Sequence, residues 1–394
     1  MHSRTIKRLT AGMLLVTMTL AACGSDDGGD AATPSSAAST SAAQATDAPA
    51  TTGGSETTIA GGDDTPAPAG DACAPEDVVL IGQVRDETNP YEKSWLDGGD
   101  EFAASVGLEQ KRLTYGDDST KEQDQIKQEL SSGNTSCYVL NILPNTEGDT
   151  KPIADAAKEA GAFLVTQWNK PADLAVEDYD RWASHISYDG VESGKLIAET
   201  MFHAMGGEGG IVALQGGLAT TAAKDRFAGL QEALAANPGI ELLDEQTANW
   251  SQAEALTVLQ TLITKHGDKI KGVWTANDGM ALGAMEALDA AGMSDVAVVG
   301  IDAVPEAVTA VADGRMTATV SSDGPWQGGV GLAIGYCAAI GEIDIASLTA
   351  DNRAFYANQT LITADNAAHF ATPSVDRTEF DCANVFNRVS GPLG

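Results

Sequence analysis

From Asp77 onward, short apolar runs typical of buried strands alternate with segments of helical periodicity. The clearest runs are 78–81, 137–143, 163–166, 211–214, 272–275 and 296–301. Continuous apolar strands separated by helices predict parallel sheets that are covered on both faces. Because about ten such units exceed one doubly wound sheet, we expect an α/β protein with two doubly wound parallel-sheet lobes.

The first 22 residues have the pattern of an export signal. Basic residues precede an apolar stretch over 9–20, which is too short to span a bilayer, and the segment ends in Leu-Ala-Ala-Cys23. This ending resembles the lipobox of bacterial lipoproteins, in which the cysteine is lipidated and becomes the new N-terminus. The alternative is an ordinary signal peptide with Cys23 as a bystander. The prediction is a signal peptide over 1–22 and a lipid anchor at Cys23.

The segment that follows, 23–72, is predicted to be a disordered tether. Gly, Ala, Ser, Thr, Pro and Asp dominate it, and Ile59 is its only large aliphatic residue. Such a composition buries too little apolar surface to offset the entropy of ordering. Coil scaling gives it a mean span of about 40 Å. We therefore expect a folded region outside the cytoplasm that contacts the cell membrane only through its anchor.

The charge of the chain excludes several classes of partner. It has 23 Lys and Arg against 56 Asp and Glu, a formal net charge of −33. This disfavours nucleic acid and anionic membrane surfaces, both of which are bound by clustered basic residues. The sequence also lacks the GxSxG, HExxH and P-loop motifs. We therefore expect a binding protein rather than an enzyme, and no cofactor.

Four cysteines remain in the folded region: Cys73, Cys137, Cys337 and Cys382. In an exported chain an even number is compatible with two disulfides in any of three pairings. Cys73 and Cys382 flank the folded region, which suggests that a bond staples its ends; the alternative is four buried thiols. Because no CxxC or Cys/His cluster occurs, we predict no zinc or other metal site.

Polar residues and tryptophans follow the predicted strands. In order, they are Arg85, Asp86, Asn145, Trp168, Asn169, Asp189, Gln215, Trp250, Asn277, Asp278, Asp302, Ser322 and Asp323. In open α/β sheets ligands bind beyond the carboxyl ends of the strands, so these side chains are expected to meet there. Carboxylates, amides and guanidinium groups bind hydroxyls, while indole faces cover C–H surfaces. This chemistry indicates a neutral, polyhydroxylated ligand.

The stretch 272–292, followed by Val-Val-Gly-Ile-Asp302, resembles the second-lobe signature of type I periplasmic sugar-binding proteins. These are the ribose-type substrate-binding components of ABC transporters. Further matches are Asn89-Pro90-Tyr91, 223–226, 248–250 and 313–319, and the resemblance covers nearly all of 77–345.

The resemblance implies two lobes joined by a three-segment hinge. The expected crossings lie near 183–186, near 317–323 and within 343–353. The expected lobes are 73–183 plus 320–347 and 184–319 plus 348–394.

The resemblance also assigns roles in sugar binding. Asn89 would bind hydroxyls and Tyr91 would stack on the ring from the first lobe. From the second lobe Trp250 would cover the opposite face, and three side chains would bind hydroxyls: Arg226, Asn277 and Asp302. Each has a plainer alternative, namely a surface ion pair for Arg226, a helix cap for Asn277, a loop acid for Asp302 and a core position for Trp250.

Several positions depart from the ribose-type pattern. Glu92 stands where many members have a second aromatic residue, and Trp168-Asn169 stands where an Asp-Arg pair is frequent. Arg85 replaces a small residue, and Ser322, beside Asp323, replaces a Gln. These changes resemble the branch that takes sugar alcohols, with a smaller pocket. Arg85 either contacts the ligand or forms a salt bridge with Asp86 at the rim.

The sequence therefore predicts a monomeric, lipid-anchored solute-binding protein that delivers a sugar or short sugar alcohol to the permease of an ABC importer. Closure of the lobes on the ligand would be its mechanism. The alternative is a sugar-sensing receptor domain that signals to a membrane partner.

Overall fold

The computed structural model describes residues 72–133, 137–371 and 375–393. The predictions for the signal segment, Cys23 and the tether up to residue 71 lie outside these residues. Across the described part of the chain, every helix is too short or too polar to cross a membrane.

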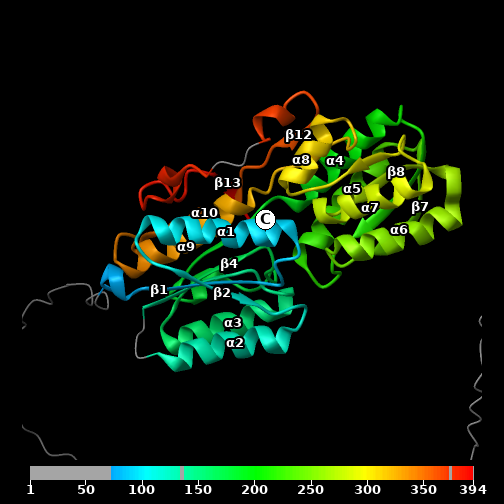
Figure 1. The fold of residues 1–394 in the computed structure, drawn as a ribbon. Coiled ribbons are helices and arrows are strands. Elements are labelled where there is room, and N and C mark those ends of the chain that lie inside the picture. Colours follow the sequence, from blue (N-terminus) through cyan, green and yellow to red (C-terminus); the bar gives the residue numbers. More distant parts are fainter. Residues whose placement is uncertain (1–71, 134–136, 372–374, 394) are drawn as a thin grey trace, which may run out of the picture. The chain divides into compact units, whose positions relative to one another are not determined.

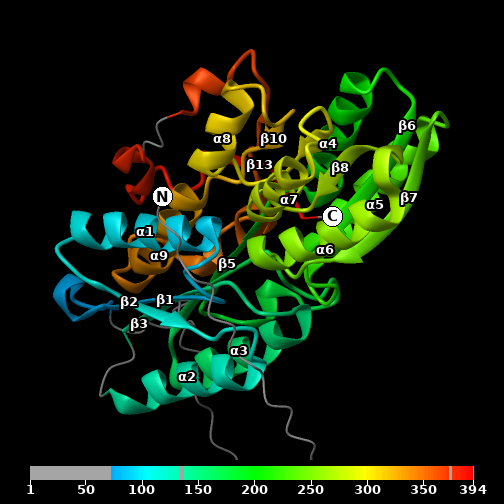
Figure 2. The same cartoon turned by 45° about the vertical axis from the view of Figure 1, so that its right-hand side comes forward.

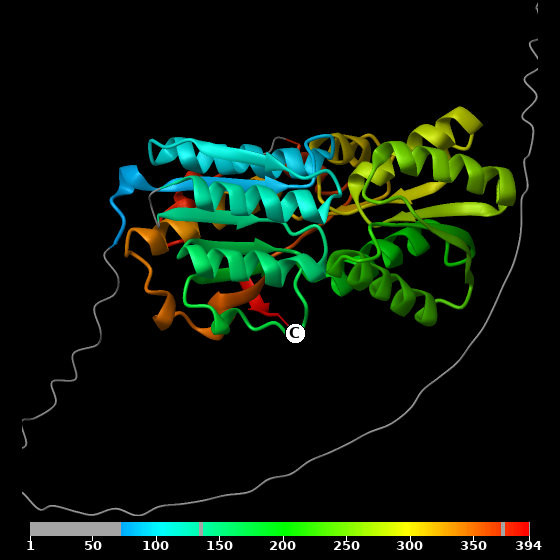
Figure 3. The ribbon, with the colours of Figure 1, turned by 90° about the horizontal axis from the view of Figure 1, so that it is seen from below.

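The first lobe is built on a seven-stranded sheet of order β13-β11-β5-β4-β3-β1-β2. Its strands are β1 (Val79–Val84), β2 (Gln110–Thr114), β3 (Tyr138–Ile142), β4 (Phe163–Gln167), β5 (Trp182–Ser187), β11 (Ala354–Ala357) and β13 (Val389–Pro392). All pairs are parallel except β11–β13. Helices α1 (Pro90–Ser105) and α9 (Gly324–Ala339) cover one face, and α2 (Ser119–Ser132) and α3 (Glu147–Ala160) cover the other (Figures 1 and 3).

Close packing of α1 on α9 depends on two glycines. A Cβ atom at Gly98 would overlap the backbone of Pro325, and one at Gly328 would overlap the backbone of Trp95. The side chain of Trp95 is fully buried and donates from Nε1 to Gln167 Oε1 on β4 at 2.8 Å. The helix pair is thereby fixed to the sheet that carries half of the site described below.

The second lobe contains a four-stranded parallel sheet of order β7-β6-β8-β9. Figure 2 labels three of its strands, β6, β7 and β8. Its strands are β6 (Gly209–Gln215), β7 (Ile240–Thr247), β8 (Ile270–Thr275) and β9 (Ala297–Val299). Its helices are α4 (Gly190–Ala204), α5 (Thr221–Ala236), α6 (Gln252–His266), α7 (Asp278–Ala291) and α8 (Pro305–Ala312). The predicted α/β class with two parallel-sheet lobes is confirmed.

The hinge differs from the expected three crossings. The chain leaves the first lobe after β5, returns to it at 321–323 and leaves it again at 358–360. The last of these crossings lies between β11 and β12 (Leu361–Ile362). Strand β12 pairs with β10 (Thr319–Val320) in the second lobe. The chain then crosses a fourth time, back to the first lobe, because the short helix Ala367–His369 packs on α8 whereas Arg377–Phe380 packs on α1 and α9.

The prediction that residues 348–394 belong to the second lobe is therefore wrong for much of this segment. Strand β11 pairs with β5, and β13 pairs with β11, so both extend the first sheet. Residues 184–187, also expected in the second lobe, are part of β5. Short two- to four-residue strands carry too little periodicity to be seen in the sequence, and only their pairing partners reveal them.

The two disulfides among the described residues lie in the first lobe. Cys73 pairs with Cys137, with Cα atoms 5.8 Å apart, and Cys337 on α9 pairs with Cys382, with Cα atoms 5.6 Å apart. The suggested bond between Cys73 and Cys382 is therefore wrong, as is the alternative of four free thiols. Each end of the folded region is instead tied separately to the sheet and helices of the first lobe.

Candidate ligand-binding site

A cavity of about 420 Å³ lies between the two lobes. Nine of the eleven residues predicted to bind ligand line it: Arg85, Asn89, Tyr91, Trp168, Asn169, Arg226, Trp250, Asn277 and Asp302. Those of the first lobe follow β1 and β4 or begin α1, and those of the second lobe follow β7, β8 and β9 or lie on α5. The carboxyl ends of parallel strands thus bring together residues more than 200 positions apart, as the sequence predicts.

Arg226 lies between two indole rings. Its Cζ atom is 4.7 Å from the ring centroid of Trp168 in the first lobe and 5.5 Å from that of Trp250 in the second. Its Nη1 donates to the carbonyl oxygen of Ala276 at 2.6 Å, and its Nη2 is 3.6 Å from Oδ1 of Asp302. The side chain is 3% exposed, so the expected alternative of a surface ion pair does not apply.

Asp302 is the carboxylate that the second lobe contributes to the cavity, whereas the side chain of Asp278 does not line it. Burial raises the pKa of the Asp302 carboxyl well above its ordinary value, and Arg226 opposes that shift. Burial also raises the pKa of Asp278 to about 7. The Asp278 oxygens accept from Thr319 Oγ1 at 2.8 Å and from the Val304 amide at 3.0 Å. Asp278 therefore fixes the loop after β9, and Asp302 is left to face the cavity.

Aromatic rings form the wall on the side of the first lobe. Trp168 Nε1 donates to the Tyr91 hydroxyl at 2.8 Å, and that hydroxyl donates to Gln327 Oε1 on α9. The Tyr91 and Trp168 rings meet edge to face at 6.0 Å. Trp168 has a φ of 65°, in the left-handed region, so its backbone is held in a strained conformation at the end of β4.

The two asparagines of the cavity also cap helices. Asn89 Oδ1 accepts from the Tyr91 amide at 3.0 Å at the start of α1, and Asn277 Oδ1 accepts from the Met280 amide at 3.0 Å at the start of α7. The predicted alternative for Asn277, a cap, is therefore present together with its position in the cavity. Among the described residues its Nδ2 group has no acceptor. That leaves the amide nitrogen, with its two N–H groups, free to donate to a ligand.

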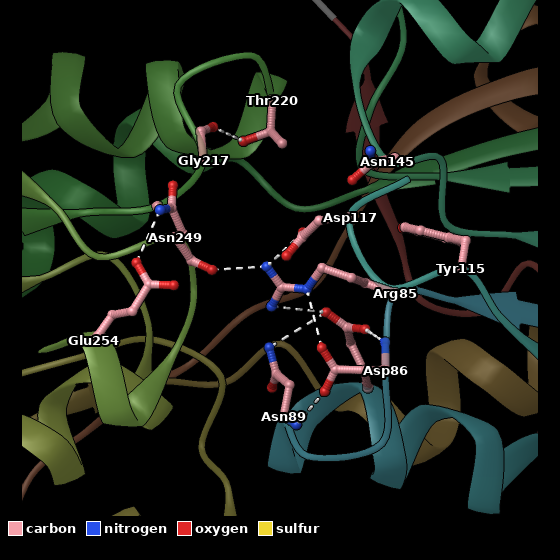
Figure 4. A network of polar contacts seen from close by, with 12 residues as sticks. Arg85, Asp86, Asn89, Tyr115, Asp117, Asn145, Gly217, Thr220, Asn249 and Glu254 are labelled. Atoms are coloured by element: carbon pink, nitrogen blue, oxygen red, sulfur yellow. Dashed lines mark hydrogen bonds and ion pairs between the residues drawn. The ribbon is translucent and has the colours of Figure 1, made fainter. Parts of the chain in front are cut away.

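Arg85 joins the two lobes beside the cavity (Figure 4). Its Nη1 donates to the carbonyl oxygen of Asn249 in the second lobe at 2.7 Å. Asp86, at 3.5 Å, is only one of its carboxylate partners: Asp117 lies at 3.3 Å and Glu92 at 3.4 Å. The two departures from the ribose-type pattern, Arg85 and Glu92, are thus in contact.

A second set of contacts joins the lobes elsewhere on the cavity rim. Glu147 at the start of α3 accepts from Lys224 Nζ at 2.5 Å and from Thr221 Oγ1 at 3.0 Å. Asn169 Oδ1 accepts from the Thr221 amide at 3.1 Å. In Figure 4, Asn145 of the first lobe lies across from the loop of the second lobe that carries Gly217 and Thr220. The lobes are therefore closed on the cavity.

Ser322 and Asp323 do not line the cavity, although they follow a strand. They lie where the chain crosses back into the first lobe. The Asp323 carboxylate caps α9 by accepting from the Trp326 amide at 3.2 Å, and it pairs with Arg388 of the C-terminal segment. The side chain of Arg388 also lies 4.8 Å from the Trp326 ring. These contacts turn Asp323 toward the C-terminal segment and away from the cavity.

Sequence reasoning did not include several residues that line the cavity among the ligand-binding positions: Glu92, Tyr115, Asp117, Asn249 and the loop 218–220. Tyr115 and Asp117 follow β2, whose sequence Gln-Lys-Arg-Leu-Thr lies at a sheet edge and lacks the apolar run of a buried strand. Had this strand been recognised, the rule that places ligands after strands would have found both residues. No group of three or more His, Cys, Asp or Glu side chains in the described ranges is arranged to hold a metal ion.

Comparisons with known proteins agree with this geometry. Residues 84–343 match the family described as a periplasmic binding protein domain. The chain is 30% identical over 274 residues to the xylitol-binding protein of Mycolicibacterium smegmatis, covering 70% of this chain and 76% of that protein. It is 32% identical over 256 residues to the ribose import binding protein of Escherichia coli, covering 64% and 80%.

Solved structures of two related proteins are also similar to this chain in fold and in sequence. A twin-arginine translocation pathway signal protein from Burkholderia phytofirmans has a TM-score of 0.77 at 39% identity, covering 80% of this chain and 98% of that one. An ABC transporter solute binding protein from Mycobacterium smegmatis with bound glycerol has a TM-score of 0.65 at 28% identity, covering 75% and 98%.

Proposed function

Because this chain belongs to the periplasmic binding protein family, the substrate-binding components of ABC transporters, we propose that it captures a short sugar alcohol or a small sugar between its lobes and delivers it to an importer. Members of this family bind solutes and are not enzymes. The proposal therefore concerns which ligand is bound and which residues bind it.

The observation that carries the proposal is the balance of charge in the cavity. Arg226 lies beside Asp302, and Arg85 lies beside Glu92 and Asp117, so each guanidinium group has carboxylates next to it. A buried cation without such partners would attract an anionic ligand. Paired charges favour a neutral molecule whose hydroxyls donate to carboxylates and accept from amides and guanidinium groups.

The volume of the cavity and the similarity of the chain to a xylitol-binding protein both favour a short ligand. A volume of about 420 Å³ lies in the lower part of the usual range for small-molecule cavities, about 300–1,000 Å³. Arg226 also occupies the space between Trp168 and Trp250, where a sugar ring would otherwise stack on both indoles. A flexible alditol fits beside this stack more readily than a hexose ring. Similarity to the xylitol-binding protein of M. smegmatis supports the same class.

Ligand recognition is assigned to both lobes. Asn89, Tyr91, Trp168 and Asn169 would contact the ligand from the first lobe, and Arg226, Trp250, Asn277 and Asp302 from the second. Because the two sets meet only when the lobes are closed, ligand shifts the hinge equilibrium toward closure. A monomer tethered through lipidated Cys23 would remain near its permease while the lobes open and close.

The first test is calorimetric titration of the purified protein with xylitol, ribitol, ribose, glycerol, myo-inositol and glucose. We expect binding of one or more pentitols or of ribose, and weaker binding of hexoses. A ligand at 100 times its Kd also adds about 2.7 kcal/mol of stability, which a thermal-shift assay detects. Absence of binding by every compound to folded protein would refute the proposal.

A pair of variants at Asn277 separates ligand binding from folding. Asn277→Ser keeps an oxygen that caps α7 but removes the Nδ2 donor, so it should raise Kd about 10-fold with little change in Tm. Asn277→Ala removes the cap as well and should also lower stability by about 1 kcal/mol. Unchanged affinity in both variants would show that Asn277 is only a cap.

A further inference from the structure

Arg85 has contacts that do not depend on a ligand. Its side chain is 7% exposed, and carboxylate oxygens of Glu92, Asp117 and Asp86 lie 3.3–3.5 Å from its guanidinium nitrogens. All three acids belong to the first lobe. Glu92 is itself held, because its oxygens accept from the Asp86 amide at 2.9 Å and from Asn89 Nδ2 at 3.3 Å. The guanidinium group is therefore held in position by its own lobe.

Within the described ranges, Arg85 makes one hydrogen bond to the second lobe, and its acceptor is a backbone oxygen. Nη1 donates to the Asn249 carbonyl at 2.7 Å, which is shorter than its contacts with the acids. Asn249 and the adjacent Trp250 have φ values of 49° and 63°, in the left-handed region, and Asn249 Nδ2 donates to Glu254 at 2.9 Å. This strained, anchored turn presents the carbonyl to Arg85 and places Trp250 in the cavity.

The hydrogen bond between Arg85 and Asn249 lies between two cavities. A second cavity of about 410 Å³ adjoins the first, and Arg85, Asn249 and Trp250 line both. In Figure 4 the Arg85 side chain extends from the first lobe to the Asn249 backbone across the space between the lobes. Breaking this hydrogen bond would therefore destabilise the closed state and connect the two cavities.

We propose that Arg85 is a positioning residue whose bond to the Asn249 carbonyl holds the lobes closed and separates the two cavities, so that it sets how long a ligand stays bound and not which ligand is chosen. This inference rests on the proposed function. It assigns to Arg85 a role different from direct recognition, which belongs to Arg226, Asn277 and Asp302.

The test compares dissociation rates across ligands. In Arg85→Ala, Glu92 would remain buried without its cation, so a second variant, Arg85→Met with Glu92→Gln, removes both charges together. We expect each variant to raise the dissociation rate about 10- to 100-fold, because it loses one charge-assisted hydrogen bond. This factor should be the same for every ligand that binds. Stopped-flow tryptophan fluorescence measures this rate.

The control is Arg377→Ala, which removes an exposed arginine whose partner, Glu101, lies in the same lobe. It should leave every rate unchanged. A factor that differs between ligands would show that Arg85 contacts the ligand directly, and an unchanged dissociation rate would show that its bond does not hold the lobes closed. Either result overturns the inference.

A ligand-free measurement keeps this test separate from the proposed function. Spin labels at Lys127→Cys on α2 and Gln260→Cys on α6 report the distance between the lobes, and both positions are exposed. Without ligand, the double variant of Arg85 and Glu92 should populate open, differently spaced lobes more than the wild type does. Identical distance distributions would refute the closing role, even if the ligand panel identified no sugar.

Discussion

Replacing Gly216 by alanine should weaken ligand binding by moving Trp250. A Cβ atom at Gly216 would lie 2.2 Å from the indole carbons Cε2 and Cζ2, whereas ordinary contact begins at 3.4 Å. The ring must therefore recede by about 1.2 Å, because Gly216 directly follows β6, whose backbone is held by pairing with β7 and β8. Such a shift disturbs the contact between Trp250 and Arg226, worth about 0.5–2 kcal/mol. We expect Kd to rise about 2- to 30-fold in calorimetric titration.

The adjacent glycine provides a matched control. A Cβ atom at Gly217 would lie 3.3 Å from Trp250 Nε1, a gap that a small adjustment relieves. Gly217→Ala should therefore bind ligand nearly as the wild type does. Wild-type affinity in Gly216→Ala, or an equal loss in both variants, would refute the argument that the position of the Trp250 ring determines affinity.

Two further predictions concern stability. Burial raises the pKa of Glu122 on α2 to about 9, and Asp149 adds to the shift, so the folded protein keeps a proton that the unfolded chain releases near pH 4.5. Stability should fall as the pH rises from 6 to 9, by up to about 4 kcal/mol, and Glu122→Gln should remove this part of the dependence in urea unfolding at both pH values. Replacing Cys337 and Cys382 by alanine opens a loop with a sequence separation of 45 and should lower the free energy of unfolding by about 4 kcal/mol in the same assay.

Each of these predictions has a clear contrary result. A parallel pH profile in wild type and Glu122→Gln would mean that Glu122 does not hold its proton in the folded state. An unchanged unfolding midpoint after loss of the Cys337–Cys382 bond would mean that α9 and β13 hold the C-terminal segment without it.

Local patterns were enough to predict most strands of the two sheets and most of the side chains that gather around the cavity. Apolar runs marked β1, β3, β4, β6 and β8, because each is buried on both faces and needs an unbroken apolar sequence. The edge strand β2 was missed for the opposite reason, since its polar sequence is half exposed. Helix α3 begins at Glu147, because Thr146 and Asp149 form a capping box there, and Pro152 lies inside its first turns.

The sequence by itself determined the alternation of strands and helices, and with it the side chains that gather at the carboxyl ends of the strands. Only the tertiary structure decided which of them pair. The Arg85–Asn249 bond joins residues 164 positions apart, Trp168 meets Arg226 from the other lobe, and Arg388 draws Asp323 away from the cavity. Local structure follows from neighbouring residues, whereas these contacts depend on how distant segments pack, which no local pattern records.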